Sequence, residues 1–309
     1  MKKVFIDGKA GTTGLRIEER LSERDDVEII SLPEEKRKDR DARCEALNSA
    51  DFVFLCLPDD AAREAVGMIN NGKTVVIDAS TAHRTNPDWA YGFAELDKSF
   101  EEKIKSSNRI AVPGCHAGGF IALVYPLVKA GIISPDATLT VHSITGYSGG
   151  GKKMIAEYES DSVDFLLKAP RQYGIAQSHK HLPEMTAITG LKNAPIFCPI
   201  VADFYSGMEV TVPIFKSQLL KGGKAEIEEV YASFYNTPIV HFNKNFDESG
   251  FLSAHKYSGK DCMSIEVLGN DDRILLVARY DNLGKGASGA AVECLNIKLG
   301  CDRAKTLVV

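Results

Sequence analysis

The chain of 309 residues lacks a long apolar run and carries little net charge. No stretch approaches the ~20 consecutive apolar residues that span a bilayer, so no membrane partner is expected. The start, "MKKVFIDGKAG", has an apolar run of three residues that ends at Asp7, and we expect no signal peptide. With 37 basic and 42 acidic residues the net charge is −5, which disfavours a broad surface for nucleic acid.

The chain also lacks the cysteine spacings of disulfide-rich and zinc-binding proteins. Its seven cysteines are an odd number, and no two are spaced as CxxC. This argues against a disulfide framework and against a tetrahedral zinc site. We therefore expect reduced thiols, no bound metal and a cytoplasmic location.

Apolar strands alternate with helices through the first third of the chain. The segments 3–7, 27–32, 50–58, 74–80 and 108–114 are typical of buried strands, and 15–24, 59–71 and 115–131 are typical of helices. Continuous apolar strands separated by helices indicate parallel βαβ units with helices on both faces of the sheet. Residues 1–116 are therefore predicted to form a doubly wound, Rossmann-type dinucleotide-binding domain of the α/β class.

The pattern changes after Ile132. The segments 137–148, 208–215, 238–243, 262–269 and 273–282 are strands with more alternation, and 152–168 and 224–236 are helical. This predicts an α+β catalytic and substrate domain with a mixed sheet over residues 117–283. The segment 284–300 is predicted to be a helix that begins with small residues, and we expect the region 284–309 to complete the first domain.

Three glycines follow the first strand with the spacing GxxGxxG: Gly8, Gly11 and Gly14. A dinucleotide needs backbone N–H groups close to its pyrophosphate at a helix N-terminus, and glycine permits that approach. Thr12 and Thr13 lie within the same loop and join the glycines as cofactor-binding candidates. The alternative is a tight structural turn, but the position between a strand and a helix favours the cofactor.

The end of the second strand favours NADP over NAD. NAD-binding domains usually place an acidic residue there for the ribose hydroxyls, but this strand ends at Ser31. A basic cluster at 36–40, which includes Arg37, follows it and suits a 2′-phosphate. The alternatives are NAD and a solvated charged loop, since Glu34 and Glu35 lie beside the cluster.

One cysteine has a reactive setting. In "IAVPGCHAGGFIAL", residues 110–123, Cys115 follows a Pro-Gly turn and opens a helix. A helix N-terminus favours a thiolate, and its backbone N–H groups can hold an oxyanion. We therefore predict that Cys115 is a nucleophile, whereas the remaining cysteines are interpreted as inert.

Two histidines in "SHKHLPEM", His179 and His181, are candidates for the general acid–base. In a strand, alternating residues face opposite sides, so only one of the two is expected to point at the thiol. A metal site is the alternative, but a clear third ligand is lacking. The other histidines, including His116, are interpreted as structural, although His116 must lie close to the site.

Anion-binding candidates follow two strands. Arg84 comes after the buried strand in "IDASTAHR", where a guanidinium could bind phosphate or carboxylate, or form a surface ion pair. The segment "GYSGGGKK", residues 146–153, contains Ser148 and Gly149 and could be an anion nest or only a loop.

Together these motifs resemble a known family. "DGKAGTTG", "IDASTAHR", "VPGCHAGG", "GYSGGGKK", "HKHLPE" and "DNLGKGASGAA" occur in this order across nearly the whole chain. The set resembles the N-acetyl-gamma-glutamyl-phosphate reductases of the shorter type, within the group that includes aspartate-semialdehyde dehydrogenase. In "YGFAEL", Ala94 replaces the proline that is usual in that family, which bears on loop rigidity and not on the chemistry.

The resemblance implies an NADP-linked reductive dephosphorylation in arginine biosynthesis that proceeds through a thioester. It implies Cys115 as the nucleophile, the histidine pair as the acid–base motif, Arg84 as a ligand of the substrate phosphate and Asn282 as a cofactor-binding residue. The expected partners are a small-molecule substrate, phosphate and further copies of the chain in a homo-oligomer. Three competing interpretations are an aspartate-semialdehyde dehydrogenase, a catalytically silent NADP sensor and a thiol hydrolase without cofactor.

Overall fold

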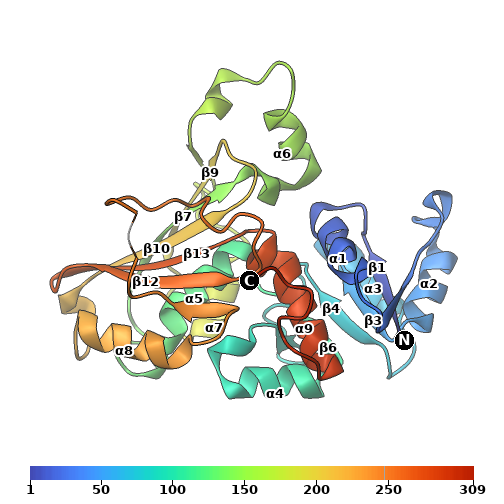
Figure 1. Cartoon of the computed structure of the whole chain (residues 1–309), viewed down its shortest axis with the longest axis horizontal. Coiled ribbons are helices and arrows are strands. Elements are labelled where there is room, and N and C mark those ends of the chain that lie inside the picture. Colours follow the sequence, from blue (N-terminus) through green and yellow to red (C-terminus); the bar gives the residue numbers. More distant parts are fainter. Residues whose placement is uncertain (247) are drawn as a thin grey trace. The chain divides into compact units, whose positions relative to one another are not determined.

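The computed structural model describes residues 1–246 and 248–309. The chain folds into two compact units (Figure 1). Unit 1 contains Met1–Gly114 and Ala287–Leu307, and unit 2 contains Cys115–Gly286 and Val308–Val309.

Unit 1 is built on a parallel sheet with the strand order β2-β1-β3-β4-β6-β5. Its strands are β1 (Lys2–Asp7), β2 (Val27–Ile30), β3 (Phe52–Leu55), β4 (Val75–Asp78), β5 (Ala90–Tyr91) and β6 (Arg109–Ala111). Its helices are α1 (Thr12–Ser22), α2 (Arg40–Ser49), α3 (Asp59–Met68), α4 (Lys98–Ser106) and α9 (Gly289–Leu299), with 3₁₀ turns at Glu34–Lys36 and Ala94–Leu96.

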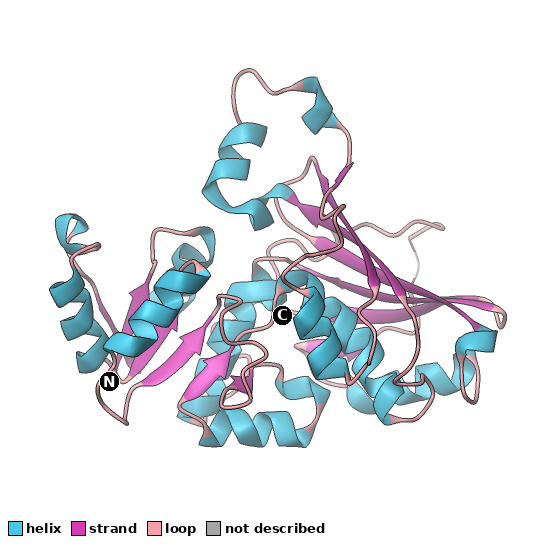
Figure 2. Ribbon diagram, turned by 180° about the vertical axis from the view of Figure 1, so that it is seen from behind, coloured by secondary structure: helices cyan, strands magenta, loops and turns pink. Residues whose placement is uncertain are grey.

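Helices cover both faces of this sheet because its strands are apolar on both sides (Figure 2). Val4 and Ile6 of β1 pack into one core cluster with residues of α1 and α9. Phe5, between them, packs into a second cluster with residues of α2 and α3. The alternation places successive side chains on opposite faces, as the period of a strand requires.

Unit 2 is built on a mixed sheet with the order β11-β12-β13-β10-β7-β9-β8. Its strands are β7 (Thr140–Gly146), β8 (Arg171–Gln172), β9 (Ile196–Ala202), β10 (Met208–Phe215), β11 (Val240–Phe242), β12 (Met263–Gly269) and β13 (Arg273–Tyr280). Its helices are α5 (Cys115–Lys129), α6 (Gly151–Tyr158), α7 (Leu182–Thr189) and α8 (Lys224–Phe234); 3₁₀ turns lie at Tyr147–Gly150, Phe165–Lys168 and Lys216–Gln218, and a π-helical turn at Gly284–Ser288. The pairs β7–β9 and β11–β12 are parallel, and β10 runs antiparallel to β7 and β13.

Helix α5 is the buried element of unit 2. It packs against β10 and β13 of the sheet and against α7 and α8. Pro126 lies inside the helix and has no N–H group, so the carbonyl of Ala122 lacks its usual partner. The buried hydroxyl of Tyr235 donates to that carbonyl at 2.6 Å, and Tyr231 donates to the carbonyl of Leu123 at 2.5 Å. Side chains of α8 and its end therefore stabilise a proline-containing helix.

The two sheets confirm the predicted fold class, with local differences. The predicted helix at 152–168 is wrong beyond Tyr158: α6 ends there, and only Phe165–Lys168 is again helical. Serine and aspartate side chains at 160–162 and 164 can compete with helical hydrogen bonds, and the Asp164 carboxylate accepts from the N–H of Leu166 at 2.9 Å. The helix predicted at 284–300 starts as a π-helical turn, and its α-helical part begins at Gly289. Among residues 1–246 and 248–309, none of the helices has the length and hydrophobicity of a transmembrane span.

Candidate functional site

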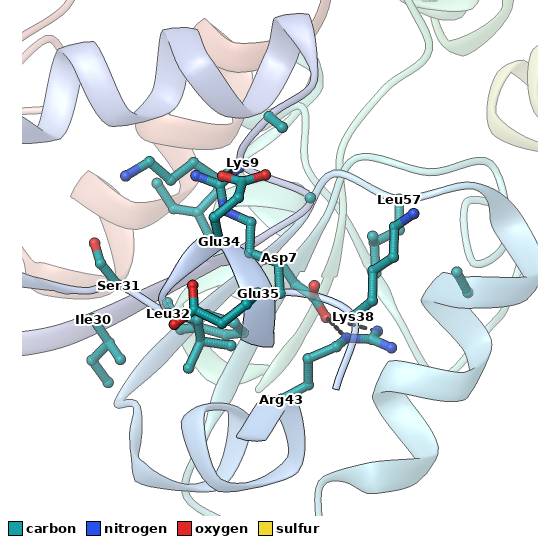
Figure 3. A pocket seen from close by; sticks show the side chains of 16 residues that line it. Asp7, Lys9, Ile30, Ser31, Leu32, Glu34, Glu35, Lys38, Arg43 and Leu57 are labelled. Atoms are coloured by element: carbon teal, nitrogen blue, oxygen red, sulfur yellow. Dashed lines mark hydrogen bonds and ion pairs between the residues drawn. The ribbon is translucent and has the colours of Figure 1, made fainter. Parts of the chain in front are cut away.

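A cavity of about 600 Å³ lies in unit 1 where β1 and β2 end (Figure 3). Gly8, Ser31 and Arg37 line it. A second cavity of about 180 Å³ is lined by Gly11, Thr12, Thr13, Cys56, Leu57 and Ala79. The predicted cofactor residues of the glycine loop and of the β2 end therefore border these two cavities, except for Gly14.

The glycine loop requires glycine for two physical reasons. Gly8 has a φ of +87°, and a Cβ there would lie 2.3 Å from the carbonyl oxygen of Cys56. A Cβ on Gly14 would lie 2.7 Å from the Cα of Lys9, so this residue lets α1 pack on its own loop. Gly11 is the N-cap residue of α1, and no side chain caps the helix. Loop and helix start thus form a cradle that fits a dinucleotide pyrophosphate.

Two ion pairs form among the charged side chains that line the larger cavity. Arg37 forms an ion pair with Glu34 at 2.5 Å. Arg43, which sequence reasoning missed, donates to the carboxylate of Asp7 at 2.9 and 3.2 Å (Figure 3). Ser31 is exposed at the end of β2. The cavity therefore offers a hydroxyl and cations, with Glu34 competing for Arg37.

Unit 2 contains the predicted nucleophile. Cys115 is the first residue of α5 and is partly buried. The next residue, His116, is buried, and its Nδ1 lies 2.6 Å from the hydroxyl oxygen of Ser143. Its Nε2 lies 2.6 Å from the hydroxyl oxygen of Tyr173. Ser143 and Tyr173 thus fix the imidazole that adjoins the nucleophile, and neither was singled out from the sequence.

The two predicted acid–base histidines lie beside His116 and not in a strand. His179 is in the loop after β8, and His181 is the N-cap residue of α7, with Pro183 following in its first turn. The expectation that strand alternation sends their rings to opposite sides is therefore wrong, because this segment turns into a helix. The ring centroids of His179 and His181 lie 6.1 and 5.7 Å from that of His116 and 4.7 Å from each other.

Burial lowers the pKa of two of these histidines, His116 and His179. Burial, with a smaller contribution from His179, lowers the pKa of His116 to about 3. The pKa of His179 is also lowered, by burial and by the charge of Lys180. His179 remains half-buried and borders a cavity of about 590 Å³ with Leu182 and Thr186. His116 therefore stays neutral near pH 7.

The lowered pKa of His116 predicts a loss of stability in mild acid. In the unfolded chain His116 binds a proton near pH 6.5, but in the folded chain it stays neutral to about pH 3. The free energy of unfolding therefore falls as pH falls through this window, by up to ~1.4 kcal/mol per pH unit. We measure the free energy of unfolding by urea titration at a series of pH values and plot it against pH. We expect His116→Gln to flatten this plot, and a matched substitution of the exposed His142, His142→Gln, to leave its slope unchanged. Equal slopes for all three proteins would contradict the assignment.

The glycine loop at 146–151 offers less to an anion than its sequence indicates. The N–H groups of Gly146, Tyr147 and Ser148 donate to carbonyls in the loop 204–207 at 2.9–3.0 Å. The Ser148 hydroxyl accepts from the amide of Asn282 at 3.0 Å, and the Asn282 oxygen accepts from the N–H of Gly207 at 2.9 Å. Ser148 and Asn282 thus lie together, while a Cβ on Gly149 would have no atom nearer than 3.4 Å.

Arg84 lies in unit 1 and is buried, so the surface-ion-pair alternative is wrong. Its Nε donates to the carbonyl of Val112 at 2.8 Å, and its Nη2 to that of Ala79 at 2.9 Å. The guanidinium therefore joins the segments that follow β4 and β6. Asp78 fixes the same loop by accepting from Ser80 and by pairing with His83 at 2.6 Å.

Metal ligands are not gathered anywhere in residues 1–246 or 248–309, where no group of three or more His, Cys, Asp or Glu side chains could hold an ion. The histidine cluster beside Cys115 contains three rings, but Ser143 and Tyr173 bind both nitrogens of His116. Both ring nitrogens of His116 are therefore engaged in hydrogen bonds and do not face a common metal position.

Comparison with known proteins supplies the family. The family model described as "Semialdehyde dehydrogenase, NAD binding domain" matches residues 3–106, and "Semialdehyde dehydrogenase, dimerisation domain" matches residues 115–282. The N-acetyl-gamma-glutamyl-phosphate reductase of Brucella ovis is 45% identical over 306 residues, which cover 96% of this chain and 99% of the relative. That of Chelativorans sp. is 47% identical over 305 residues, covering 96% and 98%.

The chain belongs to the N-acetyl-gamma-glutamyl-phosphate reductase family. This confirms the resemblance found in the motifs and makes the chain an oxidoreductase of arginine biosynthesis that binds a nicotinamide dinucleotide. The fold is shared more widely. Aspartate semialdehyde dehydrogenase II of Vibrio cholerae matches with a TM-score of 0.73 at 15% identity, over 97% of this chain and 98% of that one. A probable aspartate-semialdehyde dehydrogenase of Pseudomonas aeruginosa matches with 0.71 at 18%, over 96% and 98%.

Proposed function

We propose that the chain reduces N-acetyl-glutamyl 5-phosphate to N-acetylglutamate 5-semialdehyde and phosphate, with NADPH as the reductant. The observation that carries the proposal is a thiol at the start of a buried helix, followed in the chain by His116 of a three-imidazole cluster, in a chain whose relatives bear the name of this reductase. In the proposed division of labour, residues 1–116 with 284–309 bind the dinucleotide, and residues 117–283 bind substrate. The cytoplasm is the proposed location.

In the proposed mechanism Cys115 acts twice. One of His179 and His181 takes the proton of the thiol, and the thiolate attacks the acyl carbon. The carbon–oxygen bond to phosphate breaks, phosphate leaves and a thioester remains on Cys115. NADPH, when bound, supplies the hydride that reduces this thioester carbonyl. The resulting oxyanion is stabilised by the first-turn N–H groups of α5 until the carbon–sulfur bond breaks and the aldehyde leaves.

The remaining predicted residues take binding roles in this proposal. Arg84, Ser148 and Gly149 bind the substrate and its phosphate. Gly8, Gly11, Thr12, Thr13 and Gly14 bind the pyrophosphate, Ser31 and Arg37 bind the 2′-phosphate, and Asn282 contributes to the nicotinamide end. A homo-oligomer is proposed because the family model over residues 115–282 is described as a dimerisation domain.

The experiment that tests this function follows NADPH consumption with N-acetyl-glutamyl 5-phosphate. The reverse assay uses N-acetylglutamate 5-semialdehyde, inorganic phosphate and NADP. Turnover in both directions supports the proposal. The comparison substrates are aspartyl phosphate for the forward assay and aspartate semialdehyde for the reverse assay. They are chosen because the aspartate-semialdehyde dehydrogenases share the fold at 15–18% identity. Faster turnover of the aspartate pair would overturn the proposal in favour of that activity.

The cofactor preference is tested at the end of β2. Ser31 is exposed and lines the larger cavity of unit 1. Ser31→Asp places a carboxylate against the 2′-phosphate, and we expect it to raise the KM for NADPH roughly tenfold through like-charge repulsion. Steady-state kinetics with NADPH and NADH measure the shift. Ser22→Asp, at the exposed end of α1, is the control, and a wild-type enzyme that uses NADH as well as NADPH would contradict the assignment.

A further inference from the structure

A tyrosine hydroxyl contacts the first turn of the helix that carries the nucleophile, beside the helix's own backbone bond there. Tyr280 is the last residue of β13 and is fully buried. Its hydroxyl donates to the carbonyl oxygen of Cys115 at 2.5 Å and accepts from the N–H of Gly119 at 3.1 Å. In a regular α-helix that carbonyl and that N–H are partners, four residues apart. The hydroxyl therefore bridges the groups that close the first turn of α5.

The surrounding sequence makes room for this bridge. A Cβ on Gly119 would lie 2.5 Å from the Tyr280 hydroxyl and 2.6 Å from Cγ2 of Val210. A Cβ on Gly286 would lie 3.1 Å from the Cβ of Cys115. Both glycines thus permit close approach to the helix start. Tyr280 itself is fixed by the sheet, where it pairs with Met208 and Met263.

The bridge also sets the orientation of the adjoining amide. The carbonyl of Cys115 and the N–H of His116 belong to one planar trans peptide, so they point in opposite directions. When Tyr280 holds the carbonyl along the helix, the N–H of His116 points out of the helix N-terminus. First-turn amides have no carbonyl partner within their own helix and are the groups that stabilise an anion there.

We propose that Tyr280 is a positioning residue that aims the His116 amide at the oxyanion formed on the Cys115 adduct. The inference rests on the proposed function, since it assigns this amide to the thioester and thiohemiacetal stages. Tyr280 touches neither substrate nor cofactor in this role and acts through the Cys115–His116 peptide.

The hydroxyl can hold this position over the whole working pH range. Burial, and then the nearby Cys115, raise the pKa of Tyr280 well above its ordinary value. The proton donated to the Cys115 carbonyl is therefore retained in neutral and mildly alkaline solution. The pH dependence of kcat is therefore not expected to reflect ionisation of Tyr280.

The test compares two buried tyrosines that bind carbonyls of the same helix. Tyr280→Phe removes the bridge at Cys115, and Tyr235→Phe removes the bond to the Ala122 carbonyl, seven residues further along α5. We expect Tyr280→Phe to lower kcat roughly tenfold to a hundredfold, less than the loss of an oxyanion-hole donor itself, with the KM for NADPH unchanged. Tyr235→Phe is expected to keep kcat within about twofold, because it affects folding stability and not the peptide beside the nucleophile.

A second readout does not depend on the substrate. This readout is the rate at which iodoacetamide alkylates Cys115. It is measured on the Cys115 peptide by mass spectrometry across a pH series, and it reports the reactivity of the thiol directly. We expect a several-fold slower reaction in Tyr280→Phe than in wild type or Tyr235→Phe, since the first-turn amides also favour the thiolate. An inactive wild type would overturn the proposed function, and the alkylation rates would still decide the role of Tyr280.

Equal kcat losses and equal alkylation rates in the two variants would overturn the inference and leave Tyr280 as a structural residue. If Tyr280→Phe does not fold, the same two measurements are made on Gly119→Ala. The added methyl group displaces the Tyr280 hydroxyl from the helix without removing it. Wild-type alkylation and kcat in a folded Gly119→Ala variant would also overturn the proposal.

Discussion

Serine in place of Cys115 is expected to lower turnover by at least about a thousandfold, because a hydroxyl at neutral pH is a far weaker nucleophile than a thiolate. The side chain stands at the first residue of α5, so serine keeps the geometry and loses only the sulfur. Dinucleotide binding is expected to stay unchanged, since the glycine loop belongs to unit 1. Steady-state turnover and NADP(H) titration by fluorescence measure the two properties on one preparation.

The matched control is Cys198→Ser in β9. Cys198 is also partly buried and changes by the same single atom, but it has no role in the proposed mechanism. It is expected to keep wild-type turnover. A Cys115→Ser enzyme with more than about a tenth of wild-type activity would contradict covalent catalysis, because the loss of a nucleophile costs orders of magnitude. A parallel loss of dinucleotide binding would instead indicate misfolding.

Features of the site that depend on neighbouring residues in the chain could be predicted from the sequence. The buried strand β1, the glycines after it and the start of α1 form one local unit, and a cavity follows from that order. The same holds for Cys115, because a Pro-Gly turn before an apolar helix places the thiol at the helix start. Helices on both faces of the sheet of unit 1 follow from strands that are apolar on both sides.

Features that depend on tertiary contacts could not be predicted in this way. Tyr280 lies 165 positions from Cys115, and only the pairing of β13 with β10 and β12 brings its hydroxyl to α5. His116 was interpreted as structural, and nothing in its local sequence names Ser143 and Tyr173 as partners. The argument from alternation assumed that the histidine pair lies in a strand, whereas the start of α7 decides its conformation.

One strand and one helix, β9 and α2, were not predicted because their local sequences are unusual for these elements. β9 was missed because Pro199 lies in its interior and proline is unusual in a paired strand. Its neighbour β8 is only two residues long, so the sheet tolerates the proline near its edge. α2 was missed because its sequence, "RDARCEALNS", is mostly polar, and its stability comes from a cap at Asp39 and from packing of Ala46 and Leu47.

Alanine in place of Arg84 is expected to raise the KM for phosphate in the reverse reaction by about one to two decades. A bidentate guanidinium contact to an anion contributes ~1.5–3 kcal/mol, and each 1.4 kcal/mol is a factor of ten. Arg84→Lys keeps the charge but loses the planar fork, so it is expected to weaken phosphate use as well, by a smaller factor. NADP affinity is expected to change less than the KM for phosphate in either variant, because Arg84 lines neither cavity of the glycine loop and contacts the smaller one only through the carbonyl of Ala79.

The structure gives Arg84 a second role that the experiment must separate from phosphate binding, since its guanidinium donates to the carbonyls of Val112 and Ala79. Arg109 is the matched control. Arg109 is a partly buried arginine of the same unit. Its Nη1 also donates to two carbonyls, those of Thr74 and Asn108 at 3.0 and 2.9 Å, but at the opposite end of β6. Both alanine variants are expected to lower the melting temperature, since each removes two hydrogen bonds from a guanidinium to backbone carbonyls. Only Arg84→Ala is expected to raise the KM for phosphate. An equal rise in Arg109→Ala would show that Arg84 acts on phosphate only through the backbone that it joins, and it would remove this residue from the substrate site.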